Sequence, residues 1–328
     1  MIRKVIRKIR SARSFVVSAH VNLEGDALGS VLAMYALLRK MKKKVVVYNS
    51  DVTPEIYKFL PNSGVITNTL DEDGFDVAIV LDCSDASRTG RVKDYLGNVG
   101  CIINIDHHIS NTMFGDINWV DPRASSACEM VYKLCRELKI MDGKIAECLY
   151  TGISTDTGNF TYANATAETH RIVANLMGYG INPHKIYENL HSLCVPGDLK
   201  AMGYIFSSLK LDPRKQICWA VIKKWEEKNY DLTEVIFTMM RLLKGVEVFL
   251  LFKRVDRNKV RVNFRSRSRV DVNKIAKFFG GGGHKRASGT TIEDSLEGAE
   301  KKVISFIRRY TNGRGKGLNA QRRNSAGK

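Results

Sequence analysis

Four short runs rich in valine and isoleucine alternate with helical patterns through the first half of the chain. Near-continuous apolar runs of this length are typical of strands that are buried on both faces of a parallel sheet. The pattern therefore predicts an α/β domain with a doubly wound, mainly parallel sheet, in which ligands bind outside the carboxyl ends of the strands. The expected strands are residues 14–19, 44–49, 75–82 and 101–106, and the expected helices are residues 26–43, 125–138 and 142–154.

The pattern changes after residue 165. Residues 165–210 are mainly helical, and the remainder has the pattern of a second, smaller mixed α/β domain. The expected strands of this domain are residues 217–222, 246–255, 259–266 and 287–292, and its expected helices are residues 272–279 and 296–310. We therefore predict a first domain over residues 1–190, a helical linker over 191–212, a second domain over 213–312 and a basic, disordered tail over 313–328.

Composition is that of an ordinary globular protein. Hydrophobic residues make up 44% of the sequence and aromatic residues 9%, as in folded rather than disordered chains. No apolar run approaches the roughly 18 residues of a membrane span, and no apolar signal-peptide core follows the basic N-terminus. The seven cysteines include no C-x-x-C pair, which indicates reduced thiols. We therefore expect a cytoplasmic protein without a membrane partner.

The charge of the chain is strongly positive and is concentrated at its ends. The formal net charge is +18, from 52 lysines and arginines against 34 acidic residues. Residues 1–13 hold six basic side chains and residues 308–328 hold seven, and neither segment contains an acid. Such a balance suits a polyanionic partner, nucleic acid first. The alternative, that basic ends are only solvated and disordered, stays open for each end.

Charged and imidazole side chains follow three of the expected strands at the points where the strands end. The first strand runs into HVNLEGD, the third ends in LDCSD, and the fourth ends in IDHH. Because the carboxyl ends of parallel strands share one edge of a sheet, we expect these side chains to converge in one crevice. A further carboxylate lies in STDTGNF, just beyond a helical segment. The candidates are His20, Glu24, Asp26, Asp82, Asp106, His107, His108 and Asp156.

Carboxylates held this close repel one another and raise one another's pKa, and a divalent cation, or two, relieves that repulsion. Mixed imidazole and carboxylate ligands suit Mn²⁺, Fe²⁺ or Co²⁺ better than Ca²⁺ or structural Zn²⁺. Two such ions about 3.5–4 Å apart activate water and neutralise a phosphoryl group. The residues therefore predict metal-assisted phosphoester hydrolysis.

Each residue taken singly also has a structural explanation. Asp26 is a good N-cap for the helix that follows it, Asp82 is a good turn residue, and a lone histidine is more often structural. Independent caps and turns have no reason to gather at one edge of a sheet. The set as a whole therefore favours the metal site.

These motifs together resemble the DHH phosphoesterases, in the two-domain form that carries a DHH-associated C-terminal domain. The resemblance covers residues 10–312 and consists of five motifs in family order: HVNLEGDALGS, LDCSDASRTG, NIDHHISN, STDTGNF and FGGGGHKRASG. Within the family the chain is most similar to the stand-alone bacterial nanoRNase/pAp phosphatase group. That group degrades very short RNAs and removes the 3′-phosphate of adenosine 3′,5′-bisphosphate (pAp).

The resemblance implies two metal sites, typically for Mn²⁺, that share one carboxylate. One site would be held by His20, Glu24 and Asp82, and the other by Asp26, Asp82, His107 and Asp156. The resemblance also implies that Asp106 orients His107 and that His108 faces the substrate phosphate. Arg88, in SDASRTG, is a candidate phosphate partner, with an ordinary surface arginine as the alternative.

The sequence departs from the family pattern in its first motif. The family usually reads H-x-x-P-D-G-D, whereas Leu23 and Glu24 replace proline and aspartate in this chain. Glutamate still supplies an oxygen ligand, with one more methylene and one more rotatable bond. We therefore expect Glu24 to keep the ligand role through a longer side chain.

The second domain contains four consecutive glycines, Gly280–Gly283, followed by three basic side chains. A flexible loop is one reading, but a run between a helix and a strand also lets a phosphate approach the backbone closely. Upstream, Arg265 matches a substrate-contacting arginine of the family. We predict that the second domain binds substrate through Arg265, Ser266, Gly281, Gly282, Gly283, His284 and Arg286.

The expected function is Mn²⁺-dependent hydrolysis of nanoRNA, from dinucleotides to about pentanucleotides, and of pAp. An enzymatic alternative is a phosphodiesterase for cyclic di-AMP or its linear product pApA. A family pyrophosphatase fits less well, because the glycine run and the basic surface exceed what pyrophosphate requires. A non-enzymatic alternative is an RNA-binding module that uses the same residues. The sequence leaves open the order of substrate preference and whether the chain forms a homodimer.

Overall fold

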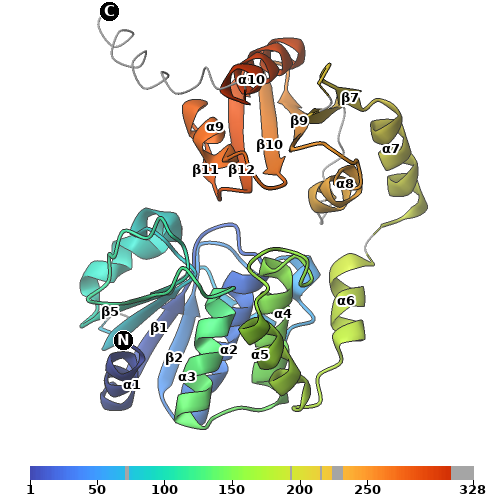
Figure 1. Ribbon diagram of the computed structural model, residues 1–328. Coiled ribbons are helices and arrows are strands. Elements are labelled where there is room, and N and C mark those ends of the chain that lie inside the picture. Colours follow the sequence, from blue (N-terminus) through green and yellow to red (C-terminus); the bar gives the residue numbers. More distant parts are fainter. Residues whose placement is uncertain (71–73, 193, 215, 224–231, 312–328) are drawn as a thin grey trace, which may run out of the picture. The chain divides into compact units, whose positions relative to one another are not determined.

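The computed structural model describes residues 1–70, 74–192, 194–214, 216–223 and 232–311 (Figure 1). The chain divides into two compact units, Met1–Leu193 and Cys194–Lys328. Each unit has its own sheet and its own hydrophobic core, and each is described by itself. The predicted tail over residues 313–328 lies outside the described residues.

A six-stranded sheet forms the centre of the first unit, and all of its neighbouring strands are parallel. Its strands are β1 (Ser14–Ser18), β2 (Lys44–Tyr48), β3 (Ile66–Thr67), β4 (Val77–Leu81), β5 (Ile102–Asp106) and β6 (Ile117–Val120). Their order is β3-β2-β1-β4-β5-β6, so the direction of winding reverses between β1 and β4. The doubly wound parallel sheet predicted from the sequence is confirmed. In such sheets the ligand crevice lies at the carboxyl ends of the strands beside the reversal.

The two edge strands, β3 and β6, are not among the strands predicted from the sequence. β3 contains only two residues, and the last three residues of β6 are half-buried. Strands this short and this exposed lack the continuous apolar run that identifies the central strands.

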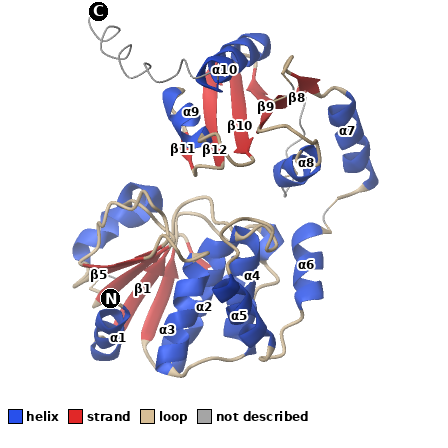
Figure 2. Ribbon diagram, viewed as in Figure 1, coloured by secondary structure: helices blue, strands red, loops and turns tan. Residues whose placement is uncertain are grey.

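Helices cover both faces of this sheet (Figure 2). The helical elements of the unit beyond its first helix are α2 (Gly25–Lys40), η1 (Glu55–Tyr57), η2 (Ser63–Val65), η3 (Ala86–Asn98), α3 (Ala127–Leu138), α4 (Gly143–Asp156), α5 (Ala167–Met177) and α6 (Pro183–His191). On one face Phe15 and Ile79 pack into the core formed by α2, α3 and α4. On the other face Val16 and Val80 pack with Val92 of η3.

Glycines allow α2 to pack closely against its neighbours. A Cβ at Gly152 would lie 2.2 Å from Sγ of Cys128, and a Cβ at Gly29 would lie 2.4 Å from the carbonyl oxygen of Cys148. Side chains at these positions would therefore force the helices apart. The close packing fixes the start of α2, which carries Asp26, at the carboxyl edge of the sheet.

The basic N-terminal segment folds as helix α1 (Ile2–Ser11). Val5 and Ile9 are fully buried in the core of the first unit, and the basic residues lie on the opposite side of the helix. The disordered alternative for this end of the chain is therefore excluded. None of the described helices combines the length and the hydropathy needed to span a bilayer.

The second unit is built on a six-stranded mixed sheet in the order β11-β12-β10-β9-β8-β7, in which only β8 and β9 are parallel neighbours. Its elements are α7 (Pro196–Ser207), β7 (Lys210–Leu211), β8 (Ile217–Ile222), α8 (Thr233–Met240), β9 (Val248–Asp256), β10 (Lys259–Ser266), α9 (Val272–Phe278), β11 (Gly282–Gly283), β12 (Ala287–Glu293) and α10 (Leu296–Thr311). Helices α9 and α10 pack on one face, and α7 and α8 pack on the other. The predicted mixed α/β domain is confirmed. Helix α7 and strand β7 lie in the segment that we predicted to be a linker.

Candidate active site

Three neighbouring strands, β1, β4 and β5, bring the candidate side chains to one edge of the first sheet. His20 lies just beyond β1, Asp82 directly follows β4, and Asp106 ends β5 with two histidines after it. Asp156 is the last residue of α4. A continuous set of contacts of 2.6–3.8 Å joins all eight candidate residues of the first unit.

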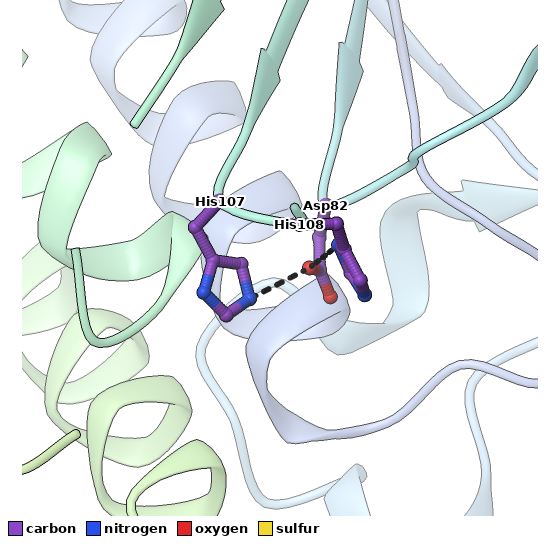
Figure 3. Close-up of side chains that lie close together, drawn as sticks. All are labelled: Asp82, His107 and His108. Carbon is purple, nitrogen blue, oxygen red and sulfur yellow. Dashed lines mark ion pairs between the residues drawn. The ribbon is translucent and has the colours of Figure 1, made fainter. Parts of the chain in front are cut away.

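Asp82 lies at the centre of this cluster (Figure 3). Its Oδ1 is 3.5 Å from Nε2 of His107 and 3.6 Å from Nδ1 of His108. Its Oδ2 is 3.4 Å from Nε2 of His20. The backbone of Asp82 has φ of 50°, a left-handed conformation that aspartate adopts more readily than most residues. The chain therefore turns at the end of β4 and leaves the carboxylate between imidazoles on both sides.

His20 uses one ring nitrogen for its own backbone and presents the other to the cluster. Nδ1 lies 2.6 Å from the carbonyl oxygen of Val21, a contact in which Nδ1–H donates. Nε2 then faces Asp82 and also Glu24, whose Oε1 is 3.7 Å away. A hydrogen bond of this kind fixes the tautomer in which Nε2 is a metal ligand.

Within the described residues, Nε2 of His20 and Oδ1 of Asp82 are buried without a hydrogen-bond partner. The nitrogen–oxygen separations around them, 3.4–3.8 Å, exceed the roughly 2.7–2.9 Å of a charge-assisted hydrogen bond. They are nearer to the about 3.0–3.4 Å expected of two atoms that each lie about 2.1 Å from one cation. The donor set therefore fits a divalent cation better than it fits direct hydrogen bonding.

Three overlapping sets of side chains can hold a cation, and in each set the ligand atoms lie within 4.8 Å of one another. The sets are His20, Glu24 and Asp82; Asp82, His107 and His108; and Asp26, His107 and Asp156. Asp82 belongs to the first two sets. His107 belongs to the second and the third set and so links them. The carboxylate of Asp82 therefore lies where two of the possible ligand sets meet.

Asp26 is fully enclosed, and it also stabilises a helix. Its carboxylate accepts hydrogen bonds from the backbone N–H groups of Ala127, at 2.6 Å, and Cys128, at 2.8 Å. These are the first residues of α3, whereas the capping alternative from the sequence assigned Asp26 to its own helix. Asp26 therefore provides hydrogen-bond acceptors for the free backbone N–H groups at the N-terminus of α3, not of α2. At the N-terminus of α2 the N-cap residue is Glu24, whose side chain makes no capping hydrogen bond.

Asp106 is paired with His108. Its Oδ1 accepts a hydrogen bond from Nδ1 of His108 at 2.6 Å, and its Oδ2 accepts one from Nδ2 of Asn111 at 2.6 Å. The expectation that Asp106 orients His107 is therefore wrong, because the carboxylate lies on the side of the chain that His108 occupies. Asn111 was not among the predicted residues, although it lies in the motif NIDHHISN.

Charges held out of water shift the pKa values of the cluster. Burial lowers the pKa of His20, but the carboxylate of Asp82 outweighs burial and raises it to about 9. Burial and the charge of Asp82 raise the pKa of Asp26 to about 7. Asp82 is itself held well below its usual pKa, because His107 and His20 outweigh its burial. Without a cation the cluster therefore retains protons at neutral pH, and a cation would displace them.

Two predicted residues lie at the rim of the cluster. The side chain of Glu24 is 61% exposed, so it reaches His20 from the solvent side. Arg88 is exposed, and its Nη1 lies 3.4 Å from Oγ of Ser84. The carbonyl of Arg88 accepts the backbone N–H of Val21, which ties the loops after β1 and β4 together.

Three of the predicted substrate residues of the second unit make hydrogen bonds within that unit. Arg265 donates to Glu234 of α8 and lies 4.9 Å from the ring centre of Phe237. Ser266 is buried, and its hydroxyl donates to the carbonyl of Val270 at 2.7 Å. Arg286 donates to the same carbonyl at 3.1 Å. Their predicted contacts with substrate stay predictions.

The second half of the glycine run forms a short strand. Gly282 and Gly283 form β11, which pairs with β12. A Cβ at Gly281 would lie 2.1 Å from the carbonyl oxygen of Gly289, and Gly283 has φ of 136°. Close backbone packing therefore requires glycine at positions 281 and 283, and the pairing of β11 with β12 contradicts a loop reading for Gly282 and Gly283. His284 is exposed directly after this strand.

The fold and the cluster together define a metal-dependent hydrolase of the α/β class. The model of the DHH family, N-terminal domain, matches residues 14–153, and the model of the DHHA1 domain matches residues 216–313. The chain belongs to the DHH family, and it is a phosphoesterase.

Similar proteins cover nearly the whole chain. A protein of Thermus thermophilus named bifunctional oligoribonuclease and PAP phosphatase NrnA is 31% identical, with 89% of this chain and 88% of that protein covered. A protein of Bacillus subtilis with the same name is 28% identical, with 89% and 93% covered. An exopolyphosphatase-related protein from Bacteroides fragilis has a similar crystal structure, with a TM-score of 0.87, 27% identity, and 94% and 96% of the two chains covered.

Proposed function

We propose that this protein is a two-metal phosphoesterase, loaded with Mn²⁺, that hydrolyses very short RNAs to mononucleotides and removes the 3′-phosphate of pAp. The names of the relatives from Thermus thermophilus and Bacillus subtilis support both substrates. Retention of every candidate ligand in one cluster supports catalysis rather than RNA binding alone.

The observation that carries this proposal is the position of Asp82 between two sets of ligands, with its Oδ1 buried and without a hydrogen-bond partner. We assign the first cation to His20, Glu24 and Asp82, and the second to Asp26, Asp82, His107 and Asp156. When bound, two cations lower the pKa of an attacking water and neutralise the phosphoryl oxygens.

Residues of the chain supply the remaining steps. Asp106 accepts from Nδ1 of His108, and this bond fixes the ring so that Nε2 can hold a proton for the substrate phosphate or the leaving oxygen. Arg88, exposed at the rim, would add a positive charge for a phosphate that is not cleaved.

We assign recognition of the rest of the nucleotide to the second unit. Arg265 and Arg286 are held by contacts within their own unit, and such held guanidinium groups lose little freedom on binding a phosphate. The other residues assigned to substrate are Ser266, Gly281, Gly282, Gly283 and His284. We place the protein in the cytoplasm because all seven of its cysteines are free thiols.

The test is a panel of substrates with Mn²⁺, Mg²⁺ or a chelator. We expect turnover of a labelled RNA dinucleotide and of pAp with Mn²⁺, loss of turnover with the chelator, and little turnover of a long RNA. Preferred turnover of cyclic di-AMP or pApA would assign the protein to the alternative activity. No turnover of any substrate with Mn²⁺ would refute the enzymatic proposal.

A further inference from the structure

Helix α1 presents a face that consists of basic side chains alone. Its apolar residues, Val5 and Ile9 among them, are buried on one side. Its basic residues lie on the opposite side of the helix, and all but one of them are exposed. These residues are Arg3, Lys4, Arg7, Lys8 and Arg10.

This face has no acidic residue in its own helix, and among the described residues none of the five basic side chains forms an ion pair within 4.0 Å. Two acids precede strands at the same edge. Asp76 accepts the backbone N–H groups of Arg13 and Ser14, and these bonds together with the charge of Lys8 lower its pKa, whereas Asp116 accepts the N–H of Ile102. Arg3 and Arg7, like Lys4 and Lys8, stand four residues apart, a spacing at which like charges destabilise a helix. The chain thus keeps an unfavourable concentration of charge at its surface.

The basic face continues onto the turn between α2 and β2. Lys42 is exposed in this turn and Lys44 is exposed at the start of β2, and Nζ of Lys43 donates to the carbonyls of Arg10 and Ala12. The bond from Lys43 holds the turn against the C-terminus of α1. We name this continuous surface of α1 and residues 42–44 the α1 basic face.

The C-terminal end of α1 and residues 42–44 lie at the opposite edge of the sheet from the candidate active site, whereas Met1 and Ile2 at the N-terminal end of α1 line a pocket with Trp119 of β6. Helix α1 leads into the start of β1, and the turn leads into the start of β2, whereas the metal cluster lies beyond the carboxyl ends (Figure 1). Because β1 has five residues, about 16 Å of strand separates the two edges. A dinucleotide bound at the cluster would therefore not contact the C-terminal end of α1 or residues 42–44.

We propose that the α1 basic face binds the phosphate backbone of long RNA that is not itself the substrate. A second copy of the chain is a poor occupant, because a two-fold contact would place like charges opposite each other. An anionic membrane is a poorer occupant, because Val5 and Ile9 on the apolar side of α1 are buried, and Met1 at the end of the helix is its one large apolar side chain that is exposed. The choice of RNA rests on the proposed function, since short RNA substrates arise from longer RNA.

The test measures binding of a long labelled RNA to the full chain by fluorescence anisotropy, with a chelator present to prevent hydrolysis. The variant is Arg3→Glu/Arg7→Glu/Arg10→Glu, and the matched control is Arg254→Glu/Arg257→Glu/Lys259→Glu. The control changes the net charge equally at exposed positions of the β9–β10 hairpin. If each of the three arginines contacts one phosphate, the variant loses about 50-fold in affinity near about 0.15 M salt, and its salt slope falls by about 2.

We expect the control to lose less than threefold, and Arg3→Lys/Arg7→Lys/Arg10→Lys to keep most of the affinity. Thermal unfolding checks that each variant is folded, and dinucleotide hydrolysis with Mn²⁺ should stay within twofold of the wild type. Equal losses in variant and control would overturn the proposal, as would tighter binding of phosphatidylserine vesicles or duplex DNA than of RNA. If the α1 basic face binds long RNA but the wild type hydrolyses neither the dinucleotide nor pAp, the result supports the RNA-binding surface and refutes the proposed function.

Discussion

Replacing Asp82 by asparagine should weaken cation binding at both proposed positions while leaving the fold in place. The substitution keeps the size of the side chain and removes its charge. The effect of that charge can be gauged from His20, whose pKa rises from 6.5 to about 9 with Asp82 as the leading favourable influence. This shift corresponds to about 3 kcal/mol for a single positive charge, or about 100-fold in affinity. A divalent cation on the same carboxylate should lose at least as much at each position.

The assay is titration of Mn²⁺ into the metal-free protein by calorimetry, followed by dinucleotide hydrolysis at saturating Mn²⁺. For Asp82→Asn we expect Mn²⁺ affinity to fall at least about 100-fold and the rate to fall at least about 1,000-fold. Asp94→Asn, an exposed aspartate on η3, is the control and should change neither quantity. Mn²⁺ affinity within threefold of the wild type in Asp82→Asn would refute the reasoning.

Four further predictions concern the pairing of Asp106 with His108, the pH dependence and the packing. Asp106→Asn should lower kcat by about 100-fold, because the amide replaces the carboxylate that accepts from Nδ1 of His108 and fixes its ring; a kcat within threefold of the wild type would contradict the role of the pairing. Mn²⁺ affinity should rise as the pH increases from neutrality to about 9, because a cation must displace the proton that His20 holds up to that pH. In the metal-free protein the raised pKa of His20 stabilises the folded state. This stabilisation is fully present below pH 6.5, the pKa of the unfolded chain, and is lost as the pH rises to about 9. Thermal stability should therefore fall between these pH values unless Mn²⁺ is present. Gly152→Ala should lower the free energy of unfolding by about 1–3 kcal/mol through overpacking, whereas Gly97→Ala, with open space around it, should have little effect.

The central strands and the position of the cluster of histidines and carboxylates could be predicted because both depend on simple physical regularities. Strands buried on both faces must be apolar throughout, so β1, β4 and β5 stand out as valine and isoleucine runs. Parallel strands place their carboxyl ends together, so Asp82 and the DHH residues had to converge once the strands were assigned. The short edge strands β3 and β6 lack such a run and could not be identified.

Side-chain pairing within the site depends on details that the sequence does not contain. Asp106 lies beside both histidines in the chain, and only the side-chain directions decide that it pairs with His108. Asp26 binds the N-terminus of a helix that begins 101 residues later, so a local capping rule assigned it to the wrong helix. Helix α1 was not predicted, because the many basic residues of this segment indicated an exposed end of the chain. Val5 and Ile9 nevertheless stand four residues apart, a spacing that is typical of a buried helix face.

The central claim, two cations that share Asp82, is tested most directly by anomalous diffraction at the manganese edge from crystals grown with Mn²⁺. The account predicts two anomalous peaks about 3.5–4 Å apart. One peak should contact His20, Glu24 and Asp82, and the other should contact Asp26, Asp82, His107 and Asp156. A single peak that does not contact Asp82, or no peak at this edge of the sheet, would contradict it.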